Sequence, residues 1–130
     1  MIPLLFRWGF RDRSVALITE GLGHRKFHGR VAILINEHSA SATEMVAAFA
    51  SENNLATTVG IKTAGRLMGA NAYKAGFGYR LALPIAVFKT WSGKIIEGVG
   101  VQPDIEVGFV KEAAVRDKDP QLDAAIRAVS

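Results

Sequence analysis

The sequence has no cysteine, which excludes a disulfide framework, thiol catalysis and any metal site built on cysteine ligands. It also has no uninterrupted apolar stretch that approaches the roughly 18 residues of a membrane span. The net charge is +4, yet the basic residues are scattered and no nucleic-acid motif accompanies them. We therefore expect a solvated basic surface, with no nucleic-acid partner and no membrane span.

The composition is that of a well-filled globular chain. With 130 residues, 49% of them hydrophobic, we expect one domain, residues 1–130, with a core of its own. Residues 1–6 are apolar, but Arg7 interrupts them too soon for the core of a signal peptide. As written, the chain is expected to be cytoplasmic, while its actual compartment stays open.

One stretch joins a buried strand to a helix. Residues 31–35 form an apolar run rich in β-branched side chains, which predicts a strand buried on both faces of a parallel sheet. Ser41 and Glu44 then have the S-x-x-E spacing of a capping box, which predicts a helix from about Ser41 to Glu52. Two roles stay open for Ser41 here: a helix cap, or a reactive group at the end of a sheet strand, where ligands collect in α/β folds.

The remaining pattern predicts more α/β structure. A second buried strand is expected at residues 56–61, which completes a βαβ unit. Residues 79–91 read as extended segments with Pro84 between them, followed by a turn at Ser92-Gly93. Further strands are expected at residues 13–19, 94–97 and 105–107, and glycine-rich loops at residues 62–69 and 98–104.

The last helix has a clear start, because Asp119 provides a cap and Pro120 the first helical residue. Its predicted apolar face is made of Leu122, Ala125, Ile126 and Val129. By contrast, His24 and His28 lie in a glycine-rich segment without a helical pattern, so no metal site is expected there.

Three motifs, in this order, resemble those of the C-terminal processing peptidases, also called tail-specific proteases. They are Asn36-Glu37-x-Ser39-Ala40-Ser41-Ala42-x-Glu44, Val59-Gly60-x-Lys62-Thr63-x-Gly65 and Gly98-Val99-Gly100-Val101-x-Pro103-Asp104-Ile105-Glu106-Val107. The closing Asp119-Pro120-Gln121-Leu122 and its helix also match, so the resemblance covers about residues 28–129.

This resemblance implies a Clp protease/crotonase-like α/β fold of ββα units, of which the chain would be the C-terminal part of the catalytic domain. It implies a serine-type peptidase that cleaves peptide or protein substrates without a cofactor or metal, with Ser41 as the nucleophile of an acyl-enzyme. The Ser41 N–H would supply one oxyanion donor, in a site loop with Ser39, Ala42, Gly65 and Arg66.

The general base departs from the family pattern. Processing peptidases use a lysine where this sequence has Arg66, and an arginine stays protonated at any useful pH. The chain is more similar here to the tricorn-like branch, which uses an upstream histidine and a glutamate at the position of Glu97. His38 is a further candidate base, because it lies three residues before Ser41.

A second departure concerns the upstream part of the family domain. Its glycine-glycine strand, which supplies the other oxyanion donor, has no counterpart between Met1 and Arg30. The chain would then be a truncated gene product, or half of a site in a homo-oligomer or completed by another chain. Three alternatives to a peptidase stay open: a non-catalytic remnant that binds peptides or a partner, an acyl-CoA enzyme that shares only the crotonase-like fold, and, least favoured, a basic nucleic-acid binder.

Overall fold

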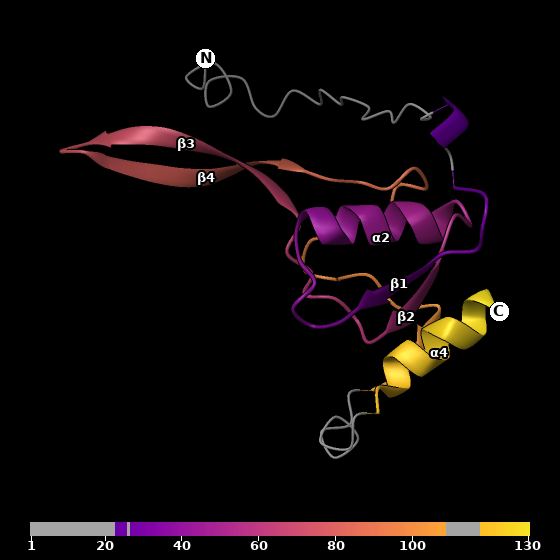
Figure 1. The fold of residues 1–130 in the computed structure, drawn as a ribbon. Helices are drawn as coiled ribbons and strands as arrows, with labels where there is room; N and C mark the ends of the chain where they lie inside the picture. Colours follow the sequence, from indigo (N-terminus) through magenta and orange to yellow (C-terminus); the bar gives the residue numbers. More distant parts are fainter. Residues whose placement is uncertain (1–22, 26, 109–117) are drawn as a thin grey trace.

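The computed structural model describes residues 23–25, 27–108 and 118–130 (Figure 1). Its centre is a three-stranded sheet, in the order β1 (Ala32–Ile35), β2 (Thr57–Gly60) and β5 (Ile105–Glu106). Both pairings are parallel, with Val59 of β2 opposite Leu34 of β1 and Ile105 of β5. The strands therefore all end at one edge of the sheet, which is where the loops that follow β1 and β2 begin.

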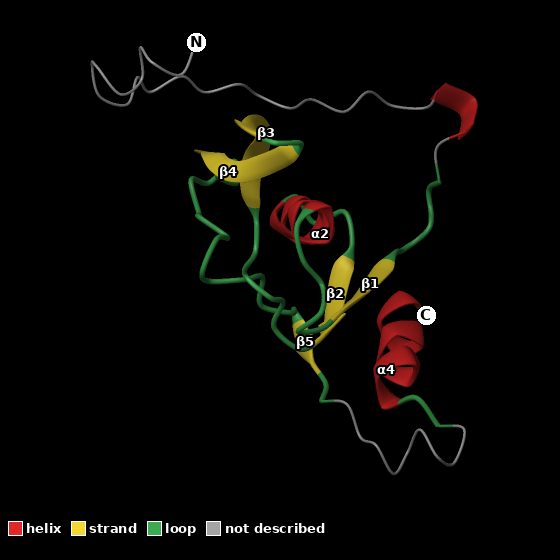
Figure 2. Cartoon of the chain, turned by 90° about the vertical axis from the view of Figure 1, so that its left-hand side faces the viewer, coloured by secondary structure: helices red, strands yellow, loops and turns green. Residues whose placement is uncertain are grey.

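Two helices, α2 (Ala42–Glu52) and α4 (Pro120–Val129), lie on opposite faces of this sheet (Figure 2). On the α2 side, a buried core joins the helix to the sheet and the neighbouring loops; its members are Ile35, Ala47, Ala48, Leu67, Ile96 and Val101. On the α4 side, Val59 packs against Ala124 and Ala125. Coverage of both faces is what a parallel sheet requires, and it leaves the carboxyl edge of the strands to the loops.

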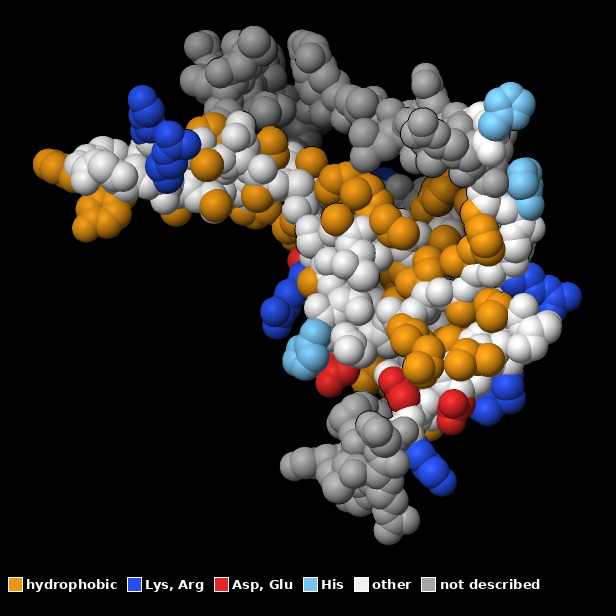
Figure 3. Space-filling model, viewed as in Figure 1, with side chains coloured by type: hydrophobic (Ala, Val, Ile, Leu, Met, Phe, Trp, Pro, Cys, Tyr) orange, Lys and Arg blue, Asp and Glu red, His pale blue; other side chains and the backbone are white. Residues whose placement is uncertain are grey.

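An antiparallel hairpin, formed by β3 (Met68–Gly76) and β4 (Tyr79–Val87), extends away from this body (Figure 1). Large apolar side chains are exposed along it, among them Tyr79, Leu81, Leu83 and Ile85. In Figure 3 apolar side chains run along this hairpin and continue onto the body. Because a two-stranded hairpin is only marginally stable in water, contact with a further surface would stabilise it.

Parts of the predicted β structure are wrong. Burial on both faces fails for β1, where Leu34 is 43% exposed because β1 is an edge strand. The loop expected at residues 62–69 ends early, since β3 begins at Met68, and its alanine-rich sequence carries little strand signal. Pro84 does not divide an extended segment but lies inside β4, paired with Ala70 at a register shift.

The predicted turn at Ser92-Gly93 is confirmed, although only Lys89 and Ile95 pair across it. Both predicted helices are also present. α2 begins directly after Ser41 and ends before Asn53, and Asn54 adopts the left-handed conformation at φ 54°.

α4 begins with the predicted cap, since the Asp119 carboxylate accepts hydrogen bonds from two backbone N–H groups of the first turn. The predicted apolar face of this helix is wrong in part. Ala124 and Ala125 are buried against the sheet, whereas Leu122 and Ile126 are about half exposed. Small alanine side chains allow the helix to approach the sheet closely, and that contact decides which face turns inward.

The strand expected at residues 13–19 lies outside the described residues, as does the opening apolar segment. Before β1 the structure has a short 3-10 helix, η1 (Gly23–Arg25), which contains His24. No helix in the described part of the chain has the length and apolar character needed to cross a membrane. The same residues contain no cluster of three or more side chains suited to hold a metal ion.

Candidate active site

Ser41 lies at the turn between β1 and α2, as the strand–helix pattern predicts. Its backbone has φ 56° and ψ −123°, a conformation that residues with a side chain rarely adopt. Enzymes of the α/β-hydrolase fold hold their nucleophilic serine in a similarly strained strand-to-helix turn, which exposes the hydroxyl. Ser41 is exposed, so this chain also presents its serine to solvent.

Ser41 is the N-cap residue of α2, and Ser41 and Glu44 have the arrangement of a capping box, although the Ser41 hydroxyl makes no full N-cap hydrogen bond. The N–H of Glu44 donates to the backbone carbonyl of Ser41 at 2.9 Å. In this box, the Glu44 carboxylate accepts from the Ser41 N–H at 3.2 Å. Ser41 therefore stands at the predicted helix cap, with its N–H bound by Glu44 and its side chain exposed to solvent.

The backbone N–H of Ser41 is already engaged. Besides Glu44, it donates to the carbonyl of Arg66 at 3.0 Å, so in this conformation it is not available as the expected oxyanion donor. The next N–H, that of Ala42, has no hydrogen-bond partner among the described residues. It lies in the first turn of α2, where unpaired N–H groups and the helix dipole favour a negative charge.

Glu44 is fully buried, and both of its oxygens have partners. Oε1 accepts from the hydroxyl of Thr63 and the N–H of Gly65, both at 2.6 Å. Oε2 accepts from the N–H of Arg66 at 2.9 Å and from that of Ser41 at 3.2 Å. Burial by itself would raise the pKa of Glu44, but these hydrogen bonds outweigh it and hold the pKa below its ordinary value. We call this carboxylate with its four donors the Glu44 staple.

Thr63 joins the Glu44 staple to the second glycine-rich loop. Its buried hydroxyl donates to Glu44 and accepts from the N–H of Val101 at 2.7 Å. Gly100 packs directly on Thr63, since a Cβ at this position would come within 2.6 Å of the Thr63 carbonyl oxygen. Gly100 also has φ 77°, so only glycine fits without strain. The two glycine-rich motifs of the sequence are therefore one packed unit beside α2.

Glu97 and Arg66 lie on these two neighbouring loops. The Glu97 carboxylate accepts from the N–H of Leu67, the residue after Arg66, at 2.5 Å. Beside it, the N–H of Gly98 donates to the carbonyl of Gly65 at 2.8 Å. Arg66 itself is exposed. The structure thus brings Arg66 and Glu97 to the end of the sheet where α2 begins.

His38 and Ser39 have other surroundings. The side chain of His38 is 85% exposed, and its Nε2 lies 3.8 Å from a carboxylate oxygen of Glu37. The hydroxyl of Ser39 closes the turn after β1, where it accepts from the Asn36 N–H at 3.1 Å and donates to the Asn36 Oδ1 at 3.3 Å. Ser39 therefore shapes the loop that leads to the helix, and His38 faces solvent.

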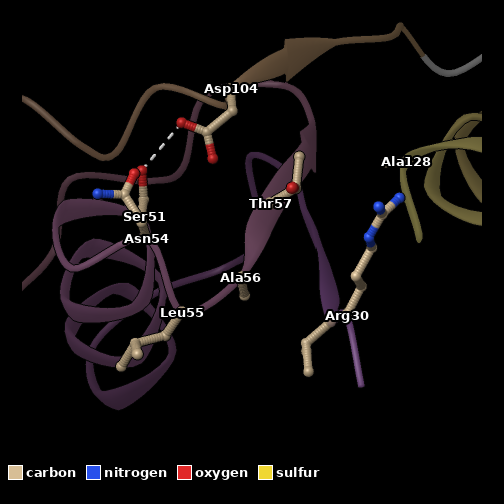
Figure 4. Close-up of a pocket in the computed structure, with 9 residues that line it drawn as sticks. Arg30, Ser51, Asn54, Leu55, Ala56, Thr57, Asp104 and Ala128 are labelled. Atoms are coloured by element: carbon tan, nitrogen blue, oxygen red, sulfur yellow. Dashed lines mark hydrogen bonds between the residues drawn. The ribbon is translucent and has the colours of Figure 1, made fainter. Parts of the chain in front are cut away.

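A second carboxylate joins elements at the opposite end of α2. Asp104 accepts at Oδ2 from the N–H and hydroxyl of Thr58, at 2.7 and 2.8 Å, and at Oδ1 from the Ser51 hydroxyl at 2.9 Å. Burial by itself would raise the pKa of Asp104, but these bonds from Thr58 and Ser51 hold it below its ordinary value. Figure 4 shows the Ser51–Asp104 contact at the wall of a cavity of about 250 Å³, which Arg30 also lines. We call this group the Asp104 staple.

The sequence pattern predicts Glu44 only as half of a capping box, and Thr63 only as part of a motif. The burial of Glu44 could have been predicted, because Glu44 lies one helical turn before Ala47 and Ala48, on the face of α2 that becomes buried. A carboxylate on a buried face requires hydrogen-bond partners. Those partners lie on another segment, so only the structure identifies them.

The sequence matches peptidase family S41 over residues 10–107. A carboxy-terminal-processing protease of Bartonella bacilliformis is 32% identical over 99 residues, which are 76% of this chain but only 23% of that protein. The tricorn protease structure aligns with a TM-score of 0.71 at 26% identity, over 77% of this chain and 10% of that one. The photosystem II D1 C-terminal processing protease aligns with a TM-score of 0.56 at 25% identity, over 61% and 20% of the two chains. The chain thus spans about a quarter of the curated relative, and its α/β fold with a parallel sheet is similar to that of S41 peptidase domains. It belongs to peptidase family S41.

Proposed function

We propose that the chain is part of a serine-type peptidase in which Ser41 is the nucleophile. The observation that carries this proposal is the strained backbone of Ser41, at φ 56° in a strand–helix turn, with the residue exposed to solvent. Membership of family S41 supports a peptide or protein substrate. In this proposal residues 1–130 are one domain, the C-terminal part of a Clp protease/crotonase-like catalytic domain.

The reaction begins when Ser41 Oγ attacks the carbonyl carbon of a peptide bond and its proton passes to a base. The carbonyl oxygen becomes an oxyanion, the amine leaves with a proton, and the acyl group stays on Ser41 until water hydrolyses it. The unpartnered Ala42 N–H supports binding of that oxyanion at the start of α2. Ser39 and Gly65 hold the two loops that border this position.

The base in this proposal comes from outside residues 1–130. Arg66 cannot accept the serine proton, and its exposed guanidinium suits binding of an anionic group instead. Glu97, held beside Arg66, supports a tricorn-like arrangement in which a carboxylate assists a histidine from elsewhere. His38 is the weaker candidate, because its ring is exposed and neighbours Glu37.

A non-catalytic module that binds peptides or a partner is the second candidate. Two observations favour it: Arg66 occupies the position of the family lysine, and Glu44 and Arg66 already hold the Ser41 N–H. In this case the fold and the motif are retained, and Ser41 reacts no faster than an ordinary surface serine.

Intact mass after incubation with a fluorophosphonate, measured on the wild type and on Ser41→Ala, separates the two candidates. A peptidase gives one adduct on the wild type and none on Ser41→Ala. Equal labelling of both proteins contradicts the assignment of Ser41 as nucleophile. Absence of an adduct on a wild type shown by circular dichroism to be folded indicates either the non-catalytic module or half of a site that residues outside this chain complete.

A further inference from the structure

The carboxylate of Glu44 makes more contacts than a capping box requires. Only its bond to the Ser41 N–H belongs to that motif. Its other three donors, the Thr63 hydroxyl and the N–H groups of Gly65 and Arg66, all lie on the loop after β2. Glu44 therefore joins the turn that carries Ser41 to a loop from a different part of the chain.

These contacts close a ring around Ser41. The Ser41 N–H donates to the Arg66 carbonyl, the Arg66 N–H donates to Glu44, and Glu44 accepts from the Ser41 N–H. On its other side, the Ser41 carbonyl accepts from the N–H groups of Glu44 and Met45, at 2.9 and 3.2 Å. Both peptide planes that flank Ser41 are therefore held, which determines its φ and ψ.

We propose that Glu44 is a positioning residue, which keeps Ser41 in its strained turn and so fixes the direction of its side chain. The inference rests on the proposed function, because it concerns the reactivity of Ser41. Four donors surround the Glu44 carboxylate, so it takes no part in proton transfer. Its effect on Ser41 passes through the backbone alone.

A carboxylate is the group that this position requires. Its two oxygens offer acceptor sites for all four donors, whereas the glutamine amide has one acceptor oxygen and an NH₂ group that would meet donors. Once released from the ring, Ser41 is expected to relax to an ordinary N-cap with an extended backbone. Its hydroxyl would then form a full N-cap hydrogen bond with the backbone N–H of residue 44, and it would be less available to a substrate.

The test compares the rate of fluorophosphonate labelling at Ser41 in the wild type and four variants. Glu44→Gln breaks the ring. Thr63→Val removes the hydroxyl that donates to the Glu44 carboxylate, and Thr63→Ser keeps a hydroxyl at that position. Asp104→Asn is the matched control, because it weakens a similar group of hydrogen bonds remote from Ser41. All rates are measured on samples shown to be folded.

We expect labelling of Glu44→Gln to be about 100-fold slower than that of the wild type, as a misplaced reacting group implies. Thr63→Val should fall between the two, while Thr63→Ser and Asp104→Asn should stay near the wild type. A wild-type rate in Glu44→Gln would overturn the inference. So would an equal slowing by Asp104→Asn, since that would indicate a general loss of stability.

Amide hydrogen exchange tests the ring independently of reactivity. The N–H groups of Ser41 and Arg66 should exchange faster in Glu44→Gln, while that of Thr58 keeps its protection. If Glu44→Gln does not fold, Thr63→Val takes its place. Unchanged exchange at Ser41 and Arg66 overturns the inference even where labelling falls. If the wild type is never labelled, Ser41 is not an activated nucleophile in this chain, while faster exchange in the variants still supports the ring.

Discussion

Two carboxylates hold opposite ends of α2, and they use the same chemistry. The Glu44 staple accepts four hydrogen bonds at the start of the helix, and the Asp104 staple accepts three near its end. Each depends on a buried threonine, Thr63 for Glu44 and Thr58 for Asp104. Each carboxyl group also has a pKa below its ordinary value because of these bonds.

The two staples differ in what they hold. Asp104 is exposed and joins two regular elements, the strand β2 and the helix α2. Glu44 is fully buried and holds irregular backbone at Ser41 and in the Arg66 loop. The same interaction therefore stabilises ordinary structure at one end of a helix and maintains a strained turn at the other. Burial is the feature that makes the second case possible, because water cannot compete for the donors.

Glu44→Gln is expected to cause the largest loss of stability, about 4 kcal/mol in the free energy of unfolding, because buried N–H donors lose their acceptor. Asp104→Asn should cost about 1 kcal/mol, since water reaches this residue and replaces the lost bonds. Chemical denaturation of the two variants measures the difference. Equal losses would show that burial does not distinguish the staples.

Gly100 packs against Thr63, so a side chain at position 100 tests how much this packing contributes to the stability of the Glu44 staple. Gly100→Ala should lower the free energy of unfolding by about 3 kcal/mol, because it adds a clash with the Thr63 carbonyl to the strain of φ 77°. Gly98 is the matched control, since its φ is 74° and a Cβ there meets nothing within 4 Å. Gly98→Ala should therefore cost only about 1 kcal/mol. Thermal denaturation checks both values, and a Gly98 variant as unstable as the Gly100 variant would contradict the role of packing.

Thr63→Val and Thr58→Val should cost a similar amount, about 2 kcal/mol each. Both lose a hydroxyl that donates to a carboxylate and accepts from a backbone N–H. Their effects on chemistry should differ, because only Thr63 contacts the Glu44 staple. Denaturation and fluorophosphonate labelling of the same two samples test this. Slower labelling in Thr58→Val would indicate that the two ends of α2 are coupled.

Acidification should weaken both staples in the same direction. The folded-state pKa values of Glu44 and Asp104 lie below their ordinary values of 4.5 and 3.8. Each contribution is therefore complete above the ordinary value and is lost as the pH falls through the lowered pKa. Unfolding measured across a pH series should show a shallower acid slope in Glu44→Gln than in the wild type, and a smaller change in Asp104→Asn. If the free energy of unfolding of both variants changed with pH as in the wild type, the lowered pKa values of Glu44 and Asp104 would be excluded as its cause.

Local patterns predicted the elements on which the site is built. The apolar runs at β1 and β2, the S-x-x-E spacing before α2 and the Asp119 cap of α4 each depend on residues close together in sequence. The position of Ser41 at a strand–helix turn follows from these alone. Its strained backbone does not, because the contacts that hold it come from the Arg66 loop.

What remained unpredicted depends on contacts between distant segments. Thr58 and Asp104 are separated by 46 positions, and Glu44 and Gly65 by 21, so no local pattern pairs them. The strand β4 falls within the predicted extended residues 79–91, but its partner β3 was missed for another reason. Alanine and glycine fill much of β3, and its apolar residues are exposed, so neither propensity nor burial marks it as a strand.

The burial of Glu44 affects how the signature of the family is to be understood. A chain without peptidase activity would still need Glu44 and Thr63 in order to fold. Their removal leaves buried hydrogen-bonding groups without partners. Selection for folding alone would therefore preserve Glu44 and Thr63 of these motifs. Ser41 and Arg66 take part in the same hydrogen bonds through their backbones only, so folding does not fix their side chains.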